Sequence, residues 1–144
     1  MSQTGYEQDF HAWSHEQAEL LRARRYADLD LDYLIEELEG MGARERRELT
    51  NQLKLLLAHL LKWQVQPEWR GPSWEATIKE QRLSLEDLLD DNPSLRPAVV
   101  ERLPRAYQLA RLLAVKETGL MEASFPQQCP YSAAETLDLE YYPA

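Results

Sequence analysis

The chain has 144 residues and a formal net charge of −9; 44% of its residues are hydrophobic and 28% are charged. These totals are typical of a soluble folded domain and exclude a disordered tail, because the hydrophobic fraction is sufficient for a core. The negative charge makes nucleic acid an unfavourable partner, because an acidic surface repels a phosphate backbone.

Cysteine content and the apolar stretches limit the class of protein further. Cys129 is the only cysteine, so neither an internal disulfide nor a cysteine-rich zinc site can form. The first ten residues lack the basic start and apolar core of a signal peptide. The longest apolar stretch, LKLLLAHLL, is too short to span a bilayer. We therefore expect a cytoplasmic protein that has no membrane segment and no cofactor.

The first predicted element is a helix near residues 6–25. One apolar stripe with a single polar member recurs at steps of three and four residues, namely Tyr6, Phe10, Trp13, Gln17, Leu20 and Leu21. His11 and His15 have the i, i+4 spacing that can hold a metal ion. They lie opposite the apolar stripe, so we interpret them as solvated histidines and predict no metal site.

The second predicted helix is long and runs from about residue 31 to about residue 66. At 100° per residue, eight positions fall within a sector roughly 60° wide: Leu31, Ile35, Leu38, Gly42, Leu49, Leu53, Leu56 and Leu60. The phase continues through Gly40 and Gly42, which favours one helix over two helices joined by a turn. The opposite face is predicted to meet water, and it carries Arg47, Asn51, Lys54, Ala58 and Lys62.

The remaining elements are also helical. Pro67, Gly71 and Pro72 predict a loop, followed by a third helix over residues 74–89 and a fourth over 97–118. Pro104 is expected to kink or interrupt the fourth helix. The tail allows at most one short helical turn after Ser132. We predict a single all-α domain over residues 1–144, a bundle of four main helices with a long second helix and an irregular C-terminal tail.

A row of polar side chains lies beside the apolar sector of the long helix, where a neighbouring helix would pack. Two interpretations are open: a hydrogen-bonded network that fixes helix register, or a polar cleft that binds a small molecule or a peptide. The candidate binding residues are Glu48, Gln52, His59, Arg70, Trp74, Gln81 and Arg82. We expect the His59 ring to bond with another element, through Gln81, Arg82, Arg70 or Glu48. Trp63 and Trp74 are expected to be mostly buried and Trp69 more exposed.

Seven segments of the chain resemble the bacterial family catalogued as domain of unknown function 29. They are YEQDFHAW with QAELLR, LDLDYLIEELEGMG, LLLAHLLKWQVQPEWR, SWEATIKEQR, DNPSL and FPQQCPY. The resemblance implies an all-helical fold and supplies no activity. The family pattern matches here at Asp9, Trp13, Glu36, Glu37, His59, Lys62, Trp63, Gln64, Pro67, Arg70, Ser73, Trp74, Thr77, Gln81 and Arg82.

The function predicted from these observations is binding. We predict a cytoplasmic helical domain that binds an unidentified protein or small molecule at the polar row, with a homodimer as a further possibility. The alternative is an enzyme that uses His59 and a nearby carboxylate in acid–base chemistry. The sequence contains neither a G-x-S-x-G nucleophile motif nor a glycine-rich phosphate loop, so it gives that alternative no further support.

Overall fold

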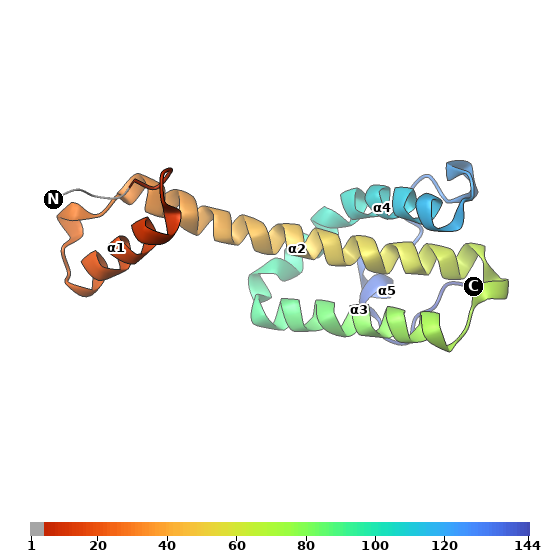
Figure 1. Ribbon diagram of the computed structural model, residues 1–144. Coiled ribbons are helices and arrows are strands. Elements are labelled where there is room, and N and C mark those ends of the chain that lie inside the picture. The colour runs from red at the N-terminus through yellow and green to blue at the C-terminus, as the bar shows by residue number, and fades with distance from the viewer. Residues whose placement is uncertain (1–4) are drawn as a thin grey trace. The chain divides into compact units, whose positions relative to one another are not determined.

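The computed structural model describes residues 5–144, and this part of the chain contains helices and no strand (Figure 1). The helices are α1 (Phe10–Arg22), α2 (Leu31–Val65), α3 (Pro72–Asp91), α4 (Arg96–Thr118) and α5 (Ala133–Leu137), with short 3₁₀ turns between them. The prediction of an all-α bundle with four main helices and a long second helix is confirmed.

The chain forms two compact units, residues 1–44 and residues 45–144, which we call the N-terminal unit and the C-terminal unit. The boundary falls inside α2, which continues through Gly40 and Gly42 as one helix. The prediction of one domain over residues 1–144 stays a prediction.

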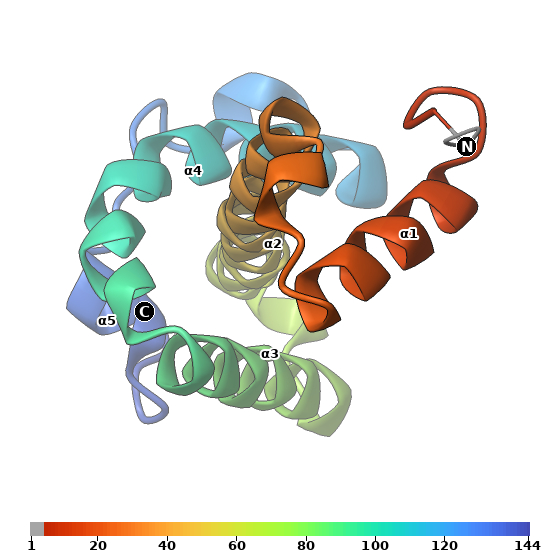
Figure 2. The same cartoon turned by 90° about the vertical axis from the view of Figure 1, so that its left-hand side faces the viewer.

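The C-terminal unit is built around the second half of α2. Figures 1 and 2 show α3, α4 and α5 arranged around this part of the helix. Leu49, Leu53, Leu56 and Leu60 are completely buried in a core that α3 and α4 share. Burial of such side chains stabilises the fold by about 1.5–3 kcal/mol each.

The solvent-facing side predicted for α2 is correct at Arg47 and Asn51, which are exposed, but it is wrong at Ala58 and Lys62. Ala58 is fully buried and Lys62 is only 9% exposed. A helical wheel with one apolar sector assumes that one side of the helix is covered. Here several elements pack around the second half of α2, so positions outside the apolar sector are buried as well.

The ends of the later helices follow local signals. Pro72 begins α3 at the first helical position, where its missing N–H group costs nothing. Gly119 ends α4 with a positive φ of 73°, a conformation that glycine adopts without strain. α4 continues through Pro104, so this residue does not interrupt the helix, and the alternative of a kink there stays a prediction. Ser132 and Glu135 form a reciprocal capping box that starts α5.

The N-terminal unit has a much smaller core. Trp13, Gln17 and Leu20 are the buried residues of α1. The indole Nε1 of Trp13 donates to the Asp30 carboxylate at 3.1 Å, and the Gln17 side-chain oxygen accepts from the Asp30 backbone N–H at 2.8 Å. The Tyr6 ring stacks on Tyr33 at 4.3 Å between centroids. Aromatic stacking and a few hydrogen bonds therefore hold α1 to the start of α2.

None of the helices in residues 5–144 combines the length and the apolarity that a membrane span requires.

Candidate functional site

His59 lies on the second half of α2 and is partly buried. Its ring Nδ1 lies 2.9 Å from the backbone carbonyl oxygen of Leu55, one turn earlier in the same helix. Because a carbonyl oxygen only accepts, Nδ1 must carry the hydrogen in this bond. The expected bond to another element is therefore wrong: within residues 5–144 the ring bonds to Leu55 of its own helix, and no hydrogen bond joins it to Gln81, Arg82, Arg70 or Glu48. Burial lowers the pKa of His59, which favours the neutral imidazole.

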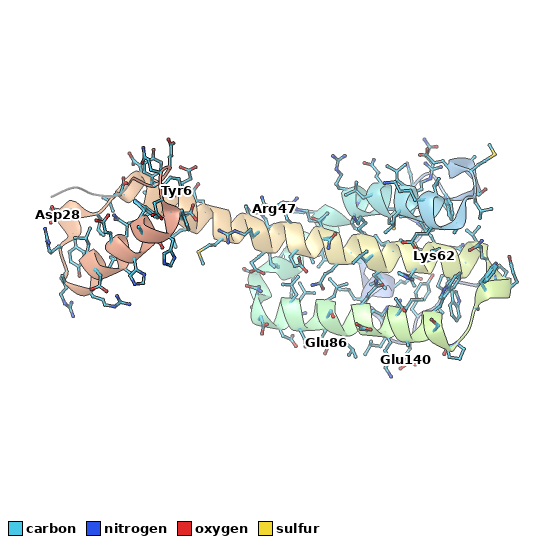
Figure 3. All side chains as sticks on the ribbon, in the orientation of Figure 1. Tyr6, Asp28, Arg47, Lys62, Glu86 and Glu140 are labelled. Atoms are coloured by element: carbon cyan, nitrogen blue, oxygen red, sulfur yellow. The ribbon has the colours of Figure 1, made fainter. Side chains whose placement is uncertain are left out.

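Lys62 joins α2 to two neighbouring helices. Its Nζ lies 2.6 Å from the Oε2 of Glu117 on α4, and 5.3 Å from the ring centroid of Trp74 on α3. Figure 3 labels Lys62 on the second half of α2. A buried ammonium group requires a countercharge, and Glu117 supplies it while the half-buried Trp74 ring adds a cation–π contact. Sequence reasoning missed this cluster, because Glu117 is 55 residues away and no local pattern links it to Lys62.

Two of the predicted polar residues, Gln52 and Gln81, line one cavity between α2 and α3, and a third, Glu48, bonds to Gln52. The amide nitrogen of Gln52 donates to the Glu48 carboxylate at 2.9 Å, and this bond fixes the orientation of the Gln52 amide. The amide oxygens of Gln52 and Gln81 are buried, and neither has a partner in the part of the chain that the structure describes. Both glutamines line a cavity of about 260 Å³ together with Leu55, Glu80 and Ser84. This cavity therefore presents hydrogen-bond acceptors to a group that donates.

Arg70 caps the end of α2. Its Nε donates to the backbone carbonyl of Trp63 at 2.7 Å, and its guanidinium lies 5.3 Å from the centre of the Trp63 ring. The last carbonyl groups of a helix carry partial negative charge, so a cation there is favourable. Arg70 is therefore occupied in holding the loop between α2 and α3 to the end of α2.

Arg82 holds the C-terminal tail. The side chain is 2% exposed, and its Nε and Nη2 donate to the carbonyls of Thr136 and Glu135 at 2.9 and 3.2 Å. Its guanidinium also lies 5.6 Å from the centre of the Tyr142 ring. The Nη1 atom is buried, with no partner in residues 5–144. Burial lowers the pKa of Arg82. Through Nε and Nη2, the positively charged guanidinium of Arg82 binds the carbonyl groups near the end of α5.

Further contacts attach the tail to the bundle. The hydroxyl of Tyr131 donates to the side-chain oxygen of Gln64 at 2.6 Å, and the Tyr142 ring lies 4.9 Å from Trp63. Burial raises the pKa of Tyr107, a residue of α4, to about 12.

Trp63 is 9% exposed and Trp69 is 65% exposed, so the prediction that Trp69 is the more exposed of the two is confirmed.

One exposed apolar surface of the N-terminal unit lies on the first half of α2. We call it the 31–41 face, and it consists of Leu31, Ile35, Leu38 and Met41, with exposed fractions of 57%, 51%, 66% and 55%. α1 and the residues before it pack on a different side of the helix, where Trp13 and Tyr6 contact Tyr33 and Tyr6 bonds to Glu37. Contiguous exposed apolar side chains are a recognised mark of a binding surface.

The N-terminal unit also has a hollow beside α1 and a pair of histidines. A shallow hollow of about 600 Å³ follows one side of α1 beside His11, His15 and Leu20. The rings of His11 and His15 are 5.7 Å apart, and both residues are exposed. Within residues 5–144, no group of three or more His, Cys, Asp or Glu side chains is arranged to hold a metal ion.

The family model for the domain of unknown function DUF29 matches residues 5–142. The chain belongs to this family. No curated protein and no solved structure matches it. In this DUF29 domain, several residues that the family resemblance singles out have structural partners. Asp9 caps α1 by accepting from the Ala12 backbone N–H at 3.0 Å, and Gln64, Arg70 and Arg82 make the contacts described above.

Proposed function

We propose that this DUF29 domain is a cytoplasmic protein-interaction module whose docking surface is the 31–41 face. The observation that carries the proposal is the exposure of Leu31, Ile35 and Leu38, each more than half accessible at helical spacing. Each square ångström of apolar surface left in water forgoes about 25 cal/mol of burial energy. A partner that covers this face would recover that energy.

The repetition of one spacing within α2 supports a helical partner. Leu49, Leu53 and Leu56 lie 18 residues after Leu31, Ile35 and Leu38, which is five turns of an α-helix. In the C-terminal unit these three leucines are covered by α3 and α4. An apolar stripe of the same spacing in the N-terminal unit has the form that a helix from another protein can cover.

The proposal is tested by cross-linking followed by a binary affinity measurement. A photo-reactive amino acid at position 35 should cross-link a specific protein in the native host, whereas the same group at Glu86, on the outward side of α3 in Figure 3, should not. The purified partner should then bind the domain, and Leu38→Asn should weaken that affinity at least about tenfold. The matched control is Leu83→Asn, because Leu83 is an exposed leucine of α3. If the unmodified domain, Leu38→Asn and Leu83→Asn bound the partner with equal affinity, the proposal would be refuted.

A small polar ligand at the cavity between α2 and α3 is a second candidate function. It is supported by the two unpaired amide oxygens of Gln52 and Gln81. A ligand that donates hydrogen bonds, such as a primary amide or an ammonium compound, would satisfy both acceptors. Its binding should shift the side-chain amide signals of Gln52 and Gln81 in a nitrogen–proton NMR spectrum, and Gln81→Leu should abolish the shift of Gln52.

Acid–base catalysis at His59 has less support. The ring nitrogen Nδ1 is already bonded to the Leu55 carbonyl, which leaves only Nε2 for a substrate. The cavity between α2 and α3 is lined by Gln52 and Gln81 and does not include His59.

A further inference from the structure

The 31–41 face has an acidic row along one edge. Asp32, Glu36 and Glu39 each follow a residue of the stripe by one position, so all three are turned to the same side of Leu31, Ile35 and Leu38. All three are exposed, and none of them forms an ion pair within residues 5–144. Residues 26–43 contain six acidic residues and neither lysine nor arginine. The edge therefore carries negative charge that the N-terminal unit leaves unneutralised.

The other edge of the face is occupied by contacts with the N-terminal segment. Asp30 and Glu37 each precede a stripe residue by one position, and both bond to that segment. Asp30 accepts from the Trp13 indole, and Glu37 accepts from the Tyr6 hydroxyl and lies 3.7 Å from Arg44. A partner on the stripe would thus meet unpaired carboxylates on one side only.

We propose that the element that docks on the 31–41 face is a basic amphipathic helix of another protein, with its lysines or arginines opposite Asp32, Glu36 and Glu39. This inference rests on the proposed function and adds the chemical class of the partner. The apolar stripe supplies the buried centre, and the acidic row selects the sign of the flanking charge.

α3 of the C-terminal unit is an example of a helix that covers the same apolar repeat of α2. α3 buries Ile78, Leu85 and Leu89 in the core with the leucines of α2, at successive steps of seven and four residues. A docking helix with apolar residues at such steps matches the repeat of the stripe. It differs from α3 in requiring positive charge along one flank.

Two other occupants fit the charges less well. In a second copy of the chain paired antiparallel about a two-fold axis, the acidic row of one copy lies beside the acidic row of the other. The carboxylates would then repel. An anionic membrane surface would repel the row for the same reason. The charges therefore favour a cationic protein segment.

The test uses three designed peptides of 20 residues that share one leucine stripe and carry lysine, glutamine or glutamate on the flanks. Fluorescence anisotropy should show at least about tenfold tighter binding of the lysine peptide than of the glutamine peptide. The glutamate peptide should bind most weakly. The lysine preference should shrink when salt is raised from about 0.05 M to about 0.3 M. Ile35→Asn should weaken the binding of all three peptides.

A matched pair of charge variants controls for general attraction between opposite charges. Asp32→Asn, Glu36→Gln and Glu39→Gln together should reduce the affinity for the lysine peptide to that for the glutamine peptide. The control combines Glu75→Gln, Glu86→Gln and Asp87→Asn, which removes the same charge from exposed positions of α3. It should leave the lysine preference unchanged. Equal losses in the two triple variants would overturn the inference, because the attraction would then be unspecific.

Failure of this inference can be separated from failure of the proposed function. Equal binding of the lysine and glutamine peptides would overturn the charge selection and leave the apolar docking face intact. If no peptide bound while position 35 still cross-linked its partner, a helical occupant would be wrong but a docking face would remain. A concentration-dependent dimer in analytical ultracentrifugation that Leu38→Asn abolishes would identify a second copy as the occupant and overturn the inference.

Discussion

The two units use the same apolar spacing of α2 in opposite ways. In the C-terminal unit, Leu53 and Leu56 are completely buried by helices of the same chain. In the N-terminal unit, Ile35 and Leu38 have the corresponding spacing and remain more than half exposed. The single helix α1 covers another side of α2, where Tyr33 lies. A helical repeat thus specifies which side of a helix is apolar, but not whether the same chain covers it.

The largest expected effect concerns the small core of the N-terminal unit. Trp13→Ala should cost that unit about 3–5 kcal/mol, because the indole is 3% exposed and donates to Asp30. Hydrogen exchange should show loss of protection across α1, whereas the amides of α3 should stay protected. Trp13→Phe is the control, since it keeps most of the packing and loses one hydrogen bond. If α1 stays protected in Trp13→Ala, the indole is not the centre of this core.

The comparison between the two stripes is tested directly by two leucines 18 residues apart. Leu56→Ala should lower the free energy of unfolding by about 2–5 kcal/mol, because it leaves a cavity in a closed core. Leu38→Ala should change it by about 0.5 kcal/mol or less, since the side chain is 66% exposed. Urea unfolding followed by circular dichroism measures both. Similar losses for the two variants would mean that the 31–41 face is covered in the protein alone.

Arg82 tests whether polar side chains or apolar packing fix the tail. Arg82→Ala leaves the carbonyls of Thr136 and Glu135 without their donors, and this should cost about 1.5–3 kcal/mol. Arg96→Ala is the control, because its ion pair with Asp90 is exposed on both sides and such pairs contribute about 0–1 kcal/mol. Limited proteolysis should release the tail first in Arg82→Ala. A tail that resists proteolysis equally in both variants would show that packing alone holds it.

The smallest effect is the pH dependence from His59. Burial lowers its pKa in the folded state below the value of about 6.5 that an unfolded histidine has. The unfolded chain therefore binds more protons between these two values, so stability is lost as the pH falls from about 6.5 through the lowered pKa. His59→Gln should remove this part of the pH dependence. An NMR titration gives the pKa directly, and a value at or above 6.5 would contradict the prediction.

Much of the fold was predictable from the sequence because its signals are local. The unbroken apolar phase predicted α2 as one helix, and the predicted end near residue 66 lies next to the observed end at Val65. The fourth helix was predicted to end at residue 118, and α4 does end at Thr118. These signals act over one or two turns, so a single sequence contains them.

The contacts of the candidate site were less predictable because they join distant segments. The bond of Arg82 to Thr136 spans 54 residues and the bond of Tyr131 to Gln64 spans 67. Periodicity placed Lys62 on the solvent-exposed side of its helix, but its partner Glu117 lies on α4, far along the chain. Periodicity likewise placed Leu38 in an apolar sector without saying what would cover it. Of the predicted polar row, only Gln52 and Gln81 line one cavity within residues 5–144, and Glu48 bonds to Gln52.

The continuity of α2 across both units has a consequence for how its exposed half stays ordered. Starting a helix is costly, because several residues must be fixed before the first hydrogen bond forms, whereas adding a residue to an existing helix is nearly neutral. The leucine-rich half of α2, buried in the larger core, supplies that start. The residues that carry the 31–41 face then need only propagation, against which Gly40 and Gly42 each cost about 1 kcal/mol. A partner thus meets a helix already formed and loses less conformational entropy on binding than it would with an isolated peptide.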